Sequence, residues 1–123
     1  MNLKEVMDTL KAKGSEKARL KSKEFGINPT NSYGVSLTEL RSFSKEVEKS
    51  TEDLHSLALD LWQTGVMEAR MLAAIIDDTK EVTEEQMENW VKDFDSWALC
   101  DLVCQDLFSR TDLVEEKIEE WFS

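Results

Sequence analysis

The chain contains 123 residues, which is enough for one small domain with a modest core. Hydrophobic residues make up 41% and charged residues 33%, which is too apolar for a disordered protein, and no run approaches the roughly 18 apolar residues of a membrane helix. The formal net charge of −11 argues against nucleic-acid binding by the surface as a whole, because such binding depends on cations that meet phosphates.

The charge is distributed unevenly along the chain. Residues 1–24 hold seven Lys/Arg against four Asp/Glu, a balance of +3, whereas residues 25–123 hold eight against twenty-two, a balance of −14. A local basic patch, or cations on a missing part of the protein, could therefore still bind phosphates. The N-terminus begins an amphipathic pattern and lacks the apolar core of a signal peptide, so we expect a cytoplasmic protein with no membrane partner.

The hydrophobic periodicity predicts an all-α fold. The sequence has one Pro, four Gly and no alternating stretch of any length, which disfavours strands. A first helix carries its apolar stripe over residues 3–10 and ends near Gly14. A basic helix then runs from about Ser15 and ends before Gly26, and a loop over residues 28–33 follows.

Six further helices are expected after this loop. Two of them begin with capping boxes, at Ser36–Glu39 and Thr83–Gln86, in which the first side chain accepts a hydrogen bond from a backbone N–H of the first turn. The apolar stripes of the six helices cover residues 37–47, 54–61, 69–76, 87–94, 97–108 and 114–121.

Successive helices joined by short turns fit both a packed bundle and an α-solenoid. Three consecutive hairpins favour the solenoid, in which each hairpin buries its apolar face on its neighbours. We therefore expect a single helical-repeat domain over residues 1–123, with an N-terminal helical cap at residues 1–35 and three helix pairs at residues 36–123. The chain ends on Trp121 and Phe122 with no polar cap, which predicts either further C-terminal repeats or a second copy packed on this end.

The cysteines and the single histidine predict no chemistry of their own. Cys100 and Cys104 lie one helical turn apart, and together with His55 they give no recognisable zinc pattern, so we expect two buried small hydrophobic residues, no metal and no cofactor. Trp62 and Trp90 lie on apolar stripes and are expected in the core.

Trp97 and Asp101 are the most informative pair in the sequence. They lie four residues apart in a predicted helix, so their side chains share one face, and Asp101 falls on the apolar stripe through Cys100, Cys104 and Phe108. An unpaired carboxylate costs several kcal/mol to bury, so we expect Asp101 to open into a groove or to meet a partner. In a groove, an indole face beside an anion can hold developing positive charge.

Three motifs occur in an order that is familiar from one protein family. They are residues 57–65 (LALDLWQTG), 68–74 (EARMLAA) and 93–101 (DFDSWALCD). Together with the Gly34–Val35 step into the helix at Arg41, they resemble the DNA alkylation repair family of HEAT-like repeat DNA glycosylases, and the likeness extends over essentially the whole chain.

The resemblance implies an α-solenoid whose concave face holds duplex DNA. Enzymes of this family remove cationic N3- and N7-alkylated purines without flipping the damaged base, and Trp97 and Asp101 match the tryptophan and aspartate that the family places against the deoxyribose. The leaving group is already cationic, so no general acid is needed. A carboxylate can stabilise the oxocarbenium-like sugar and orient water, and an indole adds roughly 0.5–2 kcal/mol of cation–π attraction.

The sequence also departs from the family pattern. The second sugar-facing tryptophan and a phosphate-binding arginine belong to later repeats that this chain lacks, and Ala98 stands where many relatives carry an acid. We therefore expect the chain alone to be inactive. Candidate contacts to DNA phosphates are Ser36, Arg41, Lys17 and Lys21, although the basic helix could equally be a solvated surface.

Two other functions fit the sequence. The acidic surface favours a non-catalytic helical-repeat module that binds proteins or nucleic-acid structures. A small helical dimer whose ends stack through Trp121 and Phe122 is the third hypothesis.

Overall fold

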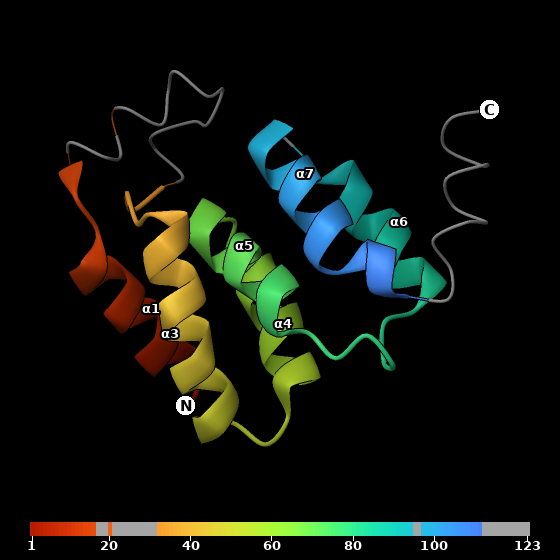
Figure 1. The fold of residues 1–123 in the computed structure, drawn as a ribbon, viewed down its shortest axis with the longest axis horizontal. Coiled ribbons are helices and arrows are strands. Elements are labelled where there is room, and N and C mark those ends of the chain that lie inside the picture. The colour runs from red at the N-terminus through yellow and green to blue at the C-terminus, as the bar shows by residue number, and fades with distance from the viewer. Residues whose placement is uncertain (17–19, 21–31, 95–96, 112–123) are drawn as a thin grey trace.

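The computed structural model describes residues 1–16, 20, 32–94 and 97–111, and it describes only the backbone of residues 97 and 98. The described part contains helices and no strand, so the all-α prediction is confirmed (Figure 1). Its main elements are α1 (Leu3–Lys13), α3 (Leu37–Ser50), α4 (Leu54–Gln63), α5 (Met67–Ile76), α6 (Glu84–Lys92), α7 (Trp97–Asp106) and a 3-10 helix at Phe108–Arg110. Most of the expected basic helix, most of the loop over residues 28–33 and the expected helix over residues 114–121 lie outside the described residues.

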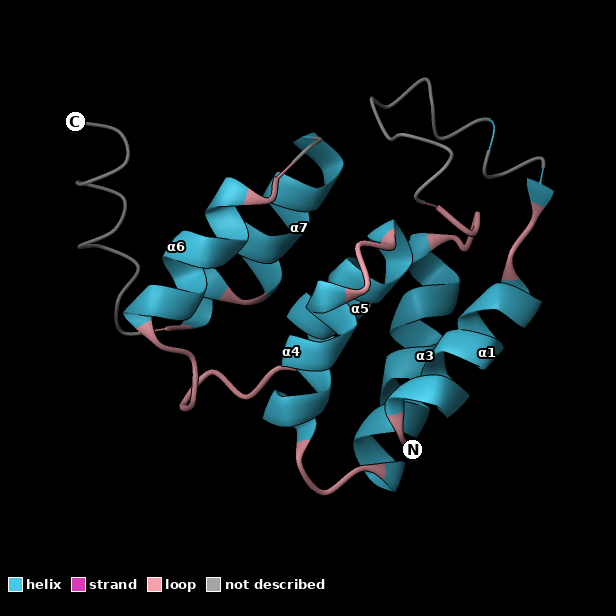
Figure 2. Cartoon of the chain, turned by 180° about the vertical axis from the view of Figure 1, so that it is seen from behind, coloured by secondary structure: helices cyan, strands magenta, loops and turns pink. Residues whose placement is uncertain are grey.

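The helices are arranged in two layers. Helices α3, α5 and α7 lie side by side in one layer, with α5 in contact with both of the others. Seen from behind, α1, α4 and α6 form the second layer (Figure 2). We call α3, α5 and α7 the inner helices and α1, α4 and α6 the outer helices. Inner helix α5 packs extensively on outer helix α4, and such packing of successive helices in two layers is typical of an α-solenoid.

Helix α5 forms the centre of the core. It contacts α1, α3, α4 and α7, and its residues Leu72, Ala73 and Ala74 are fully buried. Alanine side chains are short, so neighbouring helices can approach α5 closely. Most of the other large buried side chains come from the helices around it and include Leu10, Leu40, Phe43, Leu61, Trp62, Met87 and Leu99.

The predicted helix starts at Ser36 and Thr83 are confirmed. Ser36 Oγ accepts a hydrogen bond from the backbone N–H of Glu39 at 3.2 Å, and Thr83 Oγ1 accepts one from Gln86 at 3.1 Å. The second half of the Thr83 capping box is absent, because Gln86 Nε2 donates to the buried carboxylate of Asp77 at 2.7 Å instead of turning back to the cap.

The apolar stripe predicted for α7 is wrong. The packed face of this helix carries Leu99, Leu102, Val103 and Leu107, which are all buried. Burying these larger apolar side chains removes more surface from water than burying cysteine and aspartate would. Asp101 and Cys104 are consequently exposed and Cys100 is only half-buried, so the prediction of two buried cysteines is also wrong.

Phe108 belongs to the 3-10 helix after α7 and is fully buried there. The predicted core positions of Trp62 and Trp90 are confirmed. Their rings stack at a centroid distance of 4.0 Å and an interplanar angle of 4°, and this stack ties α4 to α6.

Candidate functional site

Asp101 lies on the open side of α7. The helix begins at Trp97, and Asp101 follows one turn later with an exposed side chain. Because the carboxylate is outside the packed face, it needs no internal partner to offset burial. It remains available to a ligand. The side chain of Trp97 lies outside the described residues.

A polar cluster holds the end of α6 at Asp93, four residues before α7 begins at Trp97. Trp62 Nε1 donates to Asp93 Oδ2 at 2.8 Å, and Asp93 is the residue that caps α6. Arg70 from α5 donates through Nε to the Trp62 carbonyl at 3.0 Å, and its guanidinium lies 5.1 Å from the centroid of the Trp62 ring. Three helices are thereby joined at the point where the chain approaches α7.

Glu68 anchors the segment that leads into α3. Its carboxylate is buried and accepts four hydrogen bonds, one from the Ser32 hydroxyl at 2.7 Å and three from the backbone N–H groups of Tyr33, Gly34 and Val35 at 2.9, 2.9 and 3.1 Å. Gly34 adopts a positive φ of 77°, which brings successive N–H groups toward one anion. Sequence reasoning did not single out Glu68, although an acid within the apolar helix at residues 67–76 was a signal.

The segment that Glu68 holds ends at Ser36, the cap of α3, whose side chain is exposed. Arg41 follows on the same helix and forms a bidentate ion pair with Asp106, near the end of α7, with Nη1–Oδ2 at 2.7 Å and Nη2–Oδ1 at 3.2 Å. Hydrogen bonding to Asp106 raises the pKa of Arg41. Arg41, which we predicted to contact a DNA phosphate, is therefore paired with a carboxylate of the protein itself. Lys17 and Lys21 lie outside the described residues.

The two cysteines flank Asp101 on α7. Partial burial of the thiol, together with the neighbouring Cys100, raises the pKa of Cys104 to about 11. Thiolate is the nucleophilic form of cysteine, so Cys104 is a poor nucleophile at neutral pH despite its exposure. Among the described residues, no three His, Cys, Asp or Glu side chains are grouped as ligands for a metal ion.

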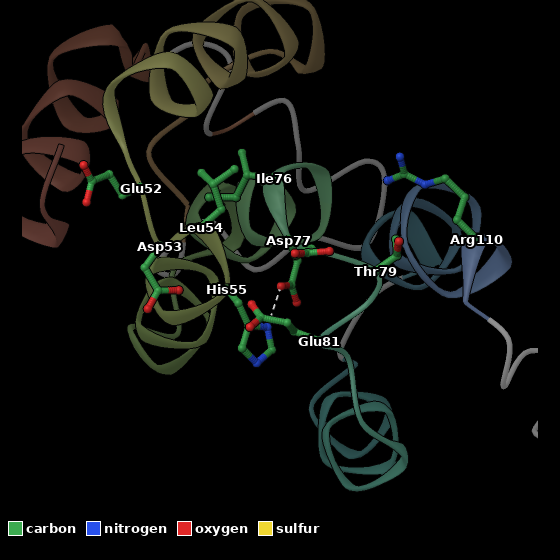
Figure 3. A pocket seen from close by; sticks show the side chains of 10 residues that line it. Glu52, Asp53, Leu54, His55, Ile76, Asp77, Thr79, Glu81 and Arg110 are labelled. Carbon is green, nitrogen blue, oxygen red and sulfur yellow. Dashed lines mark hydrogen bonds and ion pairs between the residues drawn. The ribbon is translucent and has the colours of Figure 1, made fainter.

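A cavity of about 300 Å³ opens where α4, α5 and the loop before α6 meet (Figure 3). Asp77 lines it with a fully buried side chain whose oxygens bind His55 Nδ1 and Gln86 Nε2, each at 2.7 Å. Burial outweighs these hydrogen bonds and raises the pKa of Asp77. Gln86 Oε1 is also buried and has no hydrogen-bond partner among the described residues. Sequence reasoning missed this cluster.

Helices long and apolar enough to cross a membrane are absent from the described part of the chain. No curated protein sequence matches the chain. One similar solved structure is described as a new family of proteins related to the HEAT-like repeat DNA glycosylases with affinity for branched DNA structures. It has a TM-score of 0.85 and 24% sequence identity, and the alignment covers 98% of this chain and 49% of that one. The predicted HEAT-like helical-repeat fold is confirmed.

The chain therefore spans about half the length of this structural relative. The sequence model of the DNA alkylation repair enzyme family matches residues 6–123, which is nearly the whole chain. On this match, the chain belongs to the DNA alkylation repair enzyme family.

Proposed function

We propose that the chain is part of a DNA repair protein that holds duplex DNA against its inner helices and excises cationic N3- or N7-alkylated purines without flipping the damaged base. In this proposal, Asp101 and Trp97 contact the deoxyribose of the damaged nucleotide. The observation that carries the proposal is an exposed carboxylate one helical turn after Trp97, in a chain of the DNA alkylation repair enzyme family.

The chemistry follows from the charge that develops during the reaction. As the bond to an alkylated purine breaks, positive charge moves from the base onto the deoxyribose. The Asp101 carboxylate would stabilise this charge and orient a water molecule toward the anomeric carbon, and the Trp97 indole would add cation–π attraction. The alkylated base leaves as a neutral molecule, so none of the protein's side chains has to donate a proton to it.

Phosphate contacts in this proposal come from cations and N–H groups around α3. Ser36 caps this helix, and Arg41 follows on its second turn. Residues 1–24 carry the positive part of the charge, including Lys17 and Lys21, and would reduce repulsion between DNA and the acidic remainder of the chain. Because the chain spans about half of its structural relative, we propose that the missing repeats supply further DNA contacts and that the chain alone does not release bases.

A second candidate function is binding to branched DNA without catalysis. It is supported by the affinity for branched DNA structures reported for the structural relative, and by the net charge of −11, which is unusual for a protein that encloses a duplex. A junction presents phosphates at several angles, so a chain with a few cations could bind it through a smaller basic surface.

The experiment that separates these candidates uses the longest protein that the gene encodes. Release of 7-methylguanine from methylated duplex DNA is compared for the unchanged protein, Asp101→Asn and the control Asp60→Asn, in which an exposed carboxylate on α4 is neutralised. The proposed glycosylase function predicts base release that falls at least about 100-fold in Asp101→Asn and stays near its original rate in Asp60→Asn.

An Asp101→Asn variant that releases bases at the original rate would remove Asp101 from the reaction. Absence of base release, combined with tighter binding to a four-way junction than to a duplex of equal length, would instead support the second candidate. Both substitutions change the net charge by one unit, so a general electrostatic effect would alter the two variants equally.

A further inference from the structure

The ion pair between Arg41 and Asp106 bears on how DNA could reach the inner helices. We propose that Asp106 competes with DNA phosphate for Arg41. In the free protein Arg41 is paired with Asp106, and the DNA backbone displaces this carboxylate on binding. This inference rests on the proposed DNA-binding function and adds a regulatory contact to the same surface.

The geometry of the pair makes the two ligands mutually exclusive. Both terminal nitrogens of Arg41 are engaged, Nη1 with Oδ2 and Nη2 with Oδ1 of the same carboxylate, at 2.7 and 3.2 Å. A phosphate group uses the same two-pronged approach when arginine binds it. A phosphate that binds Arg41 in this way must therefore take the place of Asp106.

The two partners are shielded from solvent to different extents. The Arg41 side chain is 48% exposed, whereas the Asp106 side chain is only 16% exposed. Asp106 shares the packed side of α7 with Leu102 and Val103, so it stays in place while the longer arginine side chain turns toward solvent. The exchange therefore needs rotation of one exposed side chain and no unfolding of either helix.

The pair also joins two helices that are otherwise linked through α5. Arg41 belongs to α3 and Asp106 to α7, and both helices pack against α5, which lies between them (Figure 1). While Arg41 is paired with Asp106, its charge is compensated inside the protein. When DNA displaces Asp106, the freed carboxylate takes up a cation from solution. This uptake offsets the release of one counterion from the DNA.

This competition predicts that removal of the carboxylate improves DNA binding. The test measures the affinity of the longest protein that the gene encodes for a fluorescein-labelled, unmodified DNA duplex as a function of salt. Asp106→Asn should lower the Kd about three- to tenfold relative to the control Asp60→Asn, which neutralises an exposed carboxylate on α4. The slope of log Kd against log salt should also steepen by about one, because Arg41 then releases a counterion without the offset.

Arg41 must be present for this gain. In an Arg41→Ala background, Asp106→Asn should improve binding no more than Asp60→Asn does. A gain that persists in that background, or an Asp106→Asn variant that binds no better than Asp60→Asn, would overturn the inference. In the second case Asp106 would position Arg41 for DNA.

Two further observations keep the test decisive. Asp106→Ser removes the carboxylate with a different side chain and must change the Kd in the same direction, so a folding defect in one variant does not decide the outcome. If the unchanged protein binds the duplex but the variants show no Arg41-dependent gain, only the competition is wrong. If neither the unchanged protein nor any variant binds duplex or branched DNA, the proposed function is wrong and the inference with it.

Discussion

The buried carboxylate of Asp77 lies 2.7 Å from Nδ1 of His55, and the two side chains join the end of α5 to the start of α4. The same carboxylate accepts a hydrogen bond from Gln86 Nε2 on α6. One ionisable group therefore connects two successive helix pairs, and its protonation affects how firmly they are held together.

We expect Asp77 to make the protein less stable as the pH rises. Burial raises the pKa of Asp77 above its ordinary value of 3.8, so the folded state retains a proton over a range in which the unfolded state has lost it. The free energy of unfolding should therefore fall as the pH rises from 3.8 through the raised pKa. Urea unfolding of the protein and of Asp77→Asn across this range measures the contribution as the difference between the two curves.

Asp77→Asn should remove that decline and stabilise the protein at pH 7 by about 1 kcal/mol. The asparagine oxygen can still accept from His55, and its amide can donate to Gln86 Oε1 once the glutamine amide turns over, so both contacts of residue 77 are kept without a buried charge. A loss of more than about 2 kcal/mol at pH 7 would show that the charge of Asp77 is required.

Glu68→Gln should be strongly destabilising. The glutamate accepts four hydrogen bonds, and glutamine turns one of its two acceptor oxygens into a donor that faces other donors. We expect a loss of about 2–4 kcal/mol in the free energy of unfolding and faster hydrogen exchange over residues 32–36. Glu46→Gln, at an exposed position on α3, is the matched control and should change stability by less than about 0.5 kcal/mol. Equal effects of the two substitutions would contradict the anchoring role.

The Trp62–Asp93 hydrogen bond should contribute measurably to stability. Trp62→Phe keeps a ring against Trp90 but removes the Nε1–H that donates to Asp93 at 2.8 Å, so we expect a loss of about 1–3 kcal/mol. In a double-mutant cycle with Asp93→Ala, which removes the acceptor, the loss in the double mutant should be smaller than the sum of the two single losses by about 1 kcal/mol. Strictly additive losses would mean that the hydrogen bond between Trp62 and Asp93 does not contribute to stability.

Cys104 should react slowly with alkylating reagents although it is exposed. Its thiol pKa of about 11 leaves little thiolate at pH 8, so carboxamidomethylation should be at least about tenfold slower than for free cysteine. The nearby Asp101 charge also raises this pKa, so Asp101→Asn should speed the reaction. The measurement follows modification at residue 104 by mass spectrometry from pH 7 to 10, and an unchanged rate in Asp101→Asn would contradict the proximity of the two groups.

The sequence predicted the helices because their signals are local. Periodic apolar residues, capping side chains at Ser36 and Thr83 and the glycines at positions 14 and 65 all act within one or two helical turns, and they agree with the observed helix bounds. The stacked pair of Trp62 and Trp90 was also predictable as core, because both residues lie on unambiguous stripes.

The polar contacts could not be predicted in the same way. Glu68 finds its four donors in a segment more than thirty residues earlier, and Arg41 meets Asp106 across 65 residues, so neither pairing leaves a local pattern. On α7, leucine, valine and cysteine residues spread over more than half of the circumference of the helix, and periodicity alone did not identify the packed face. The proposal that Trp97 and Asp101 form a site on one face of α7 stays a prediction.

The most direct test of the proposed role of Asp101 uses DNA that mimics the charge of the reacting sugar. The affinity of the chain is measured for a duplex that contains a cationic pyrrolidine in place of one deoxyribose, and for a matched duplex with a neutral tetrahydrofuran at that position. We expect the chain to prefer the cationic duplex at least about tenfold, and Asp101→Asn to lose that preference while Asp60→Asn retains it. Equal affinity of the unchanged chain for both duplexes, or a preference that survives in Asp101→Asn, would contradict the assignment of Asp101 to the deoxyribose.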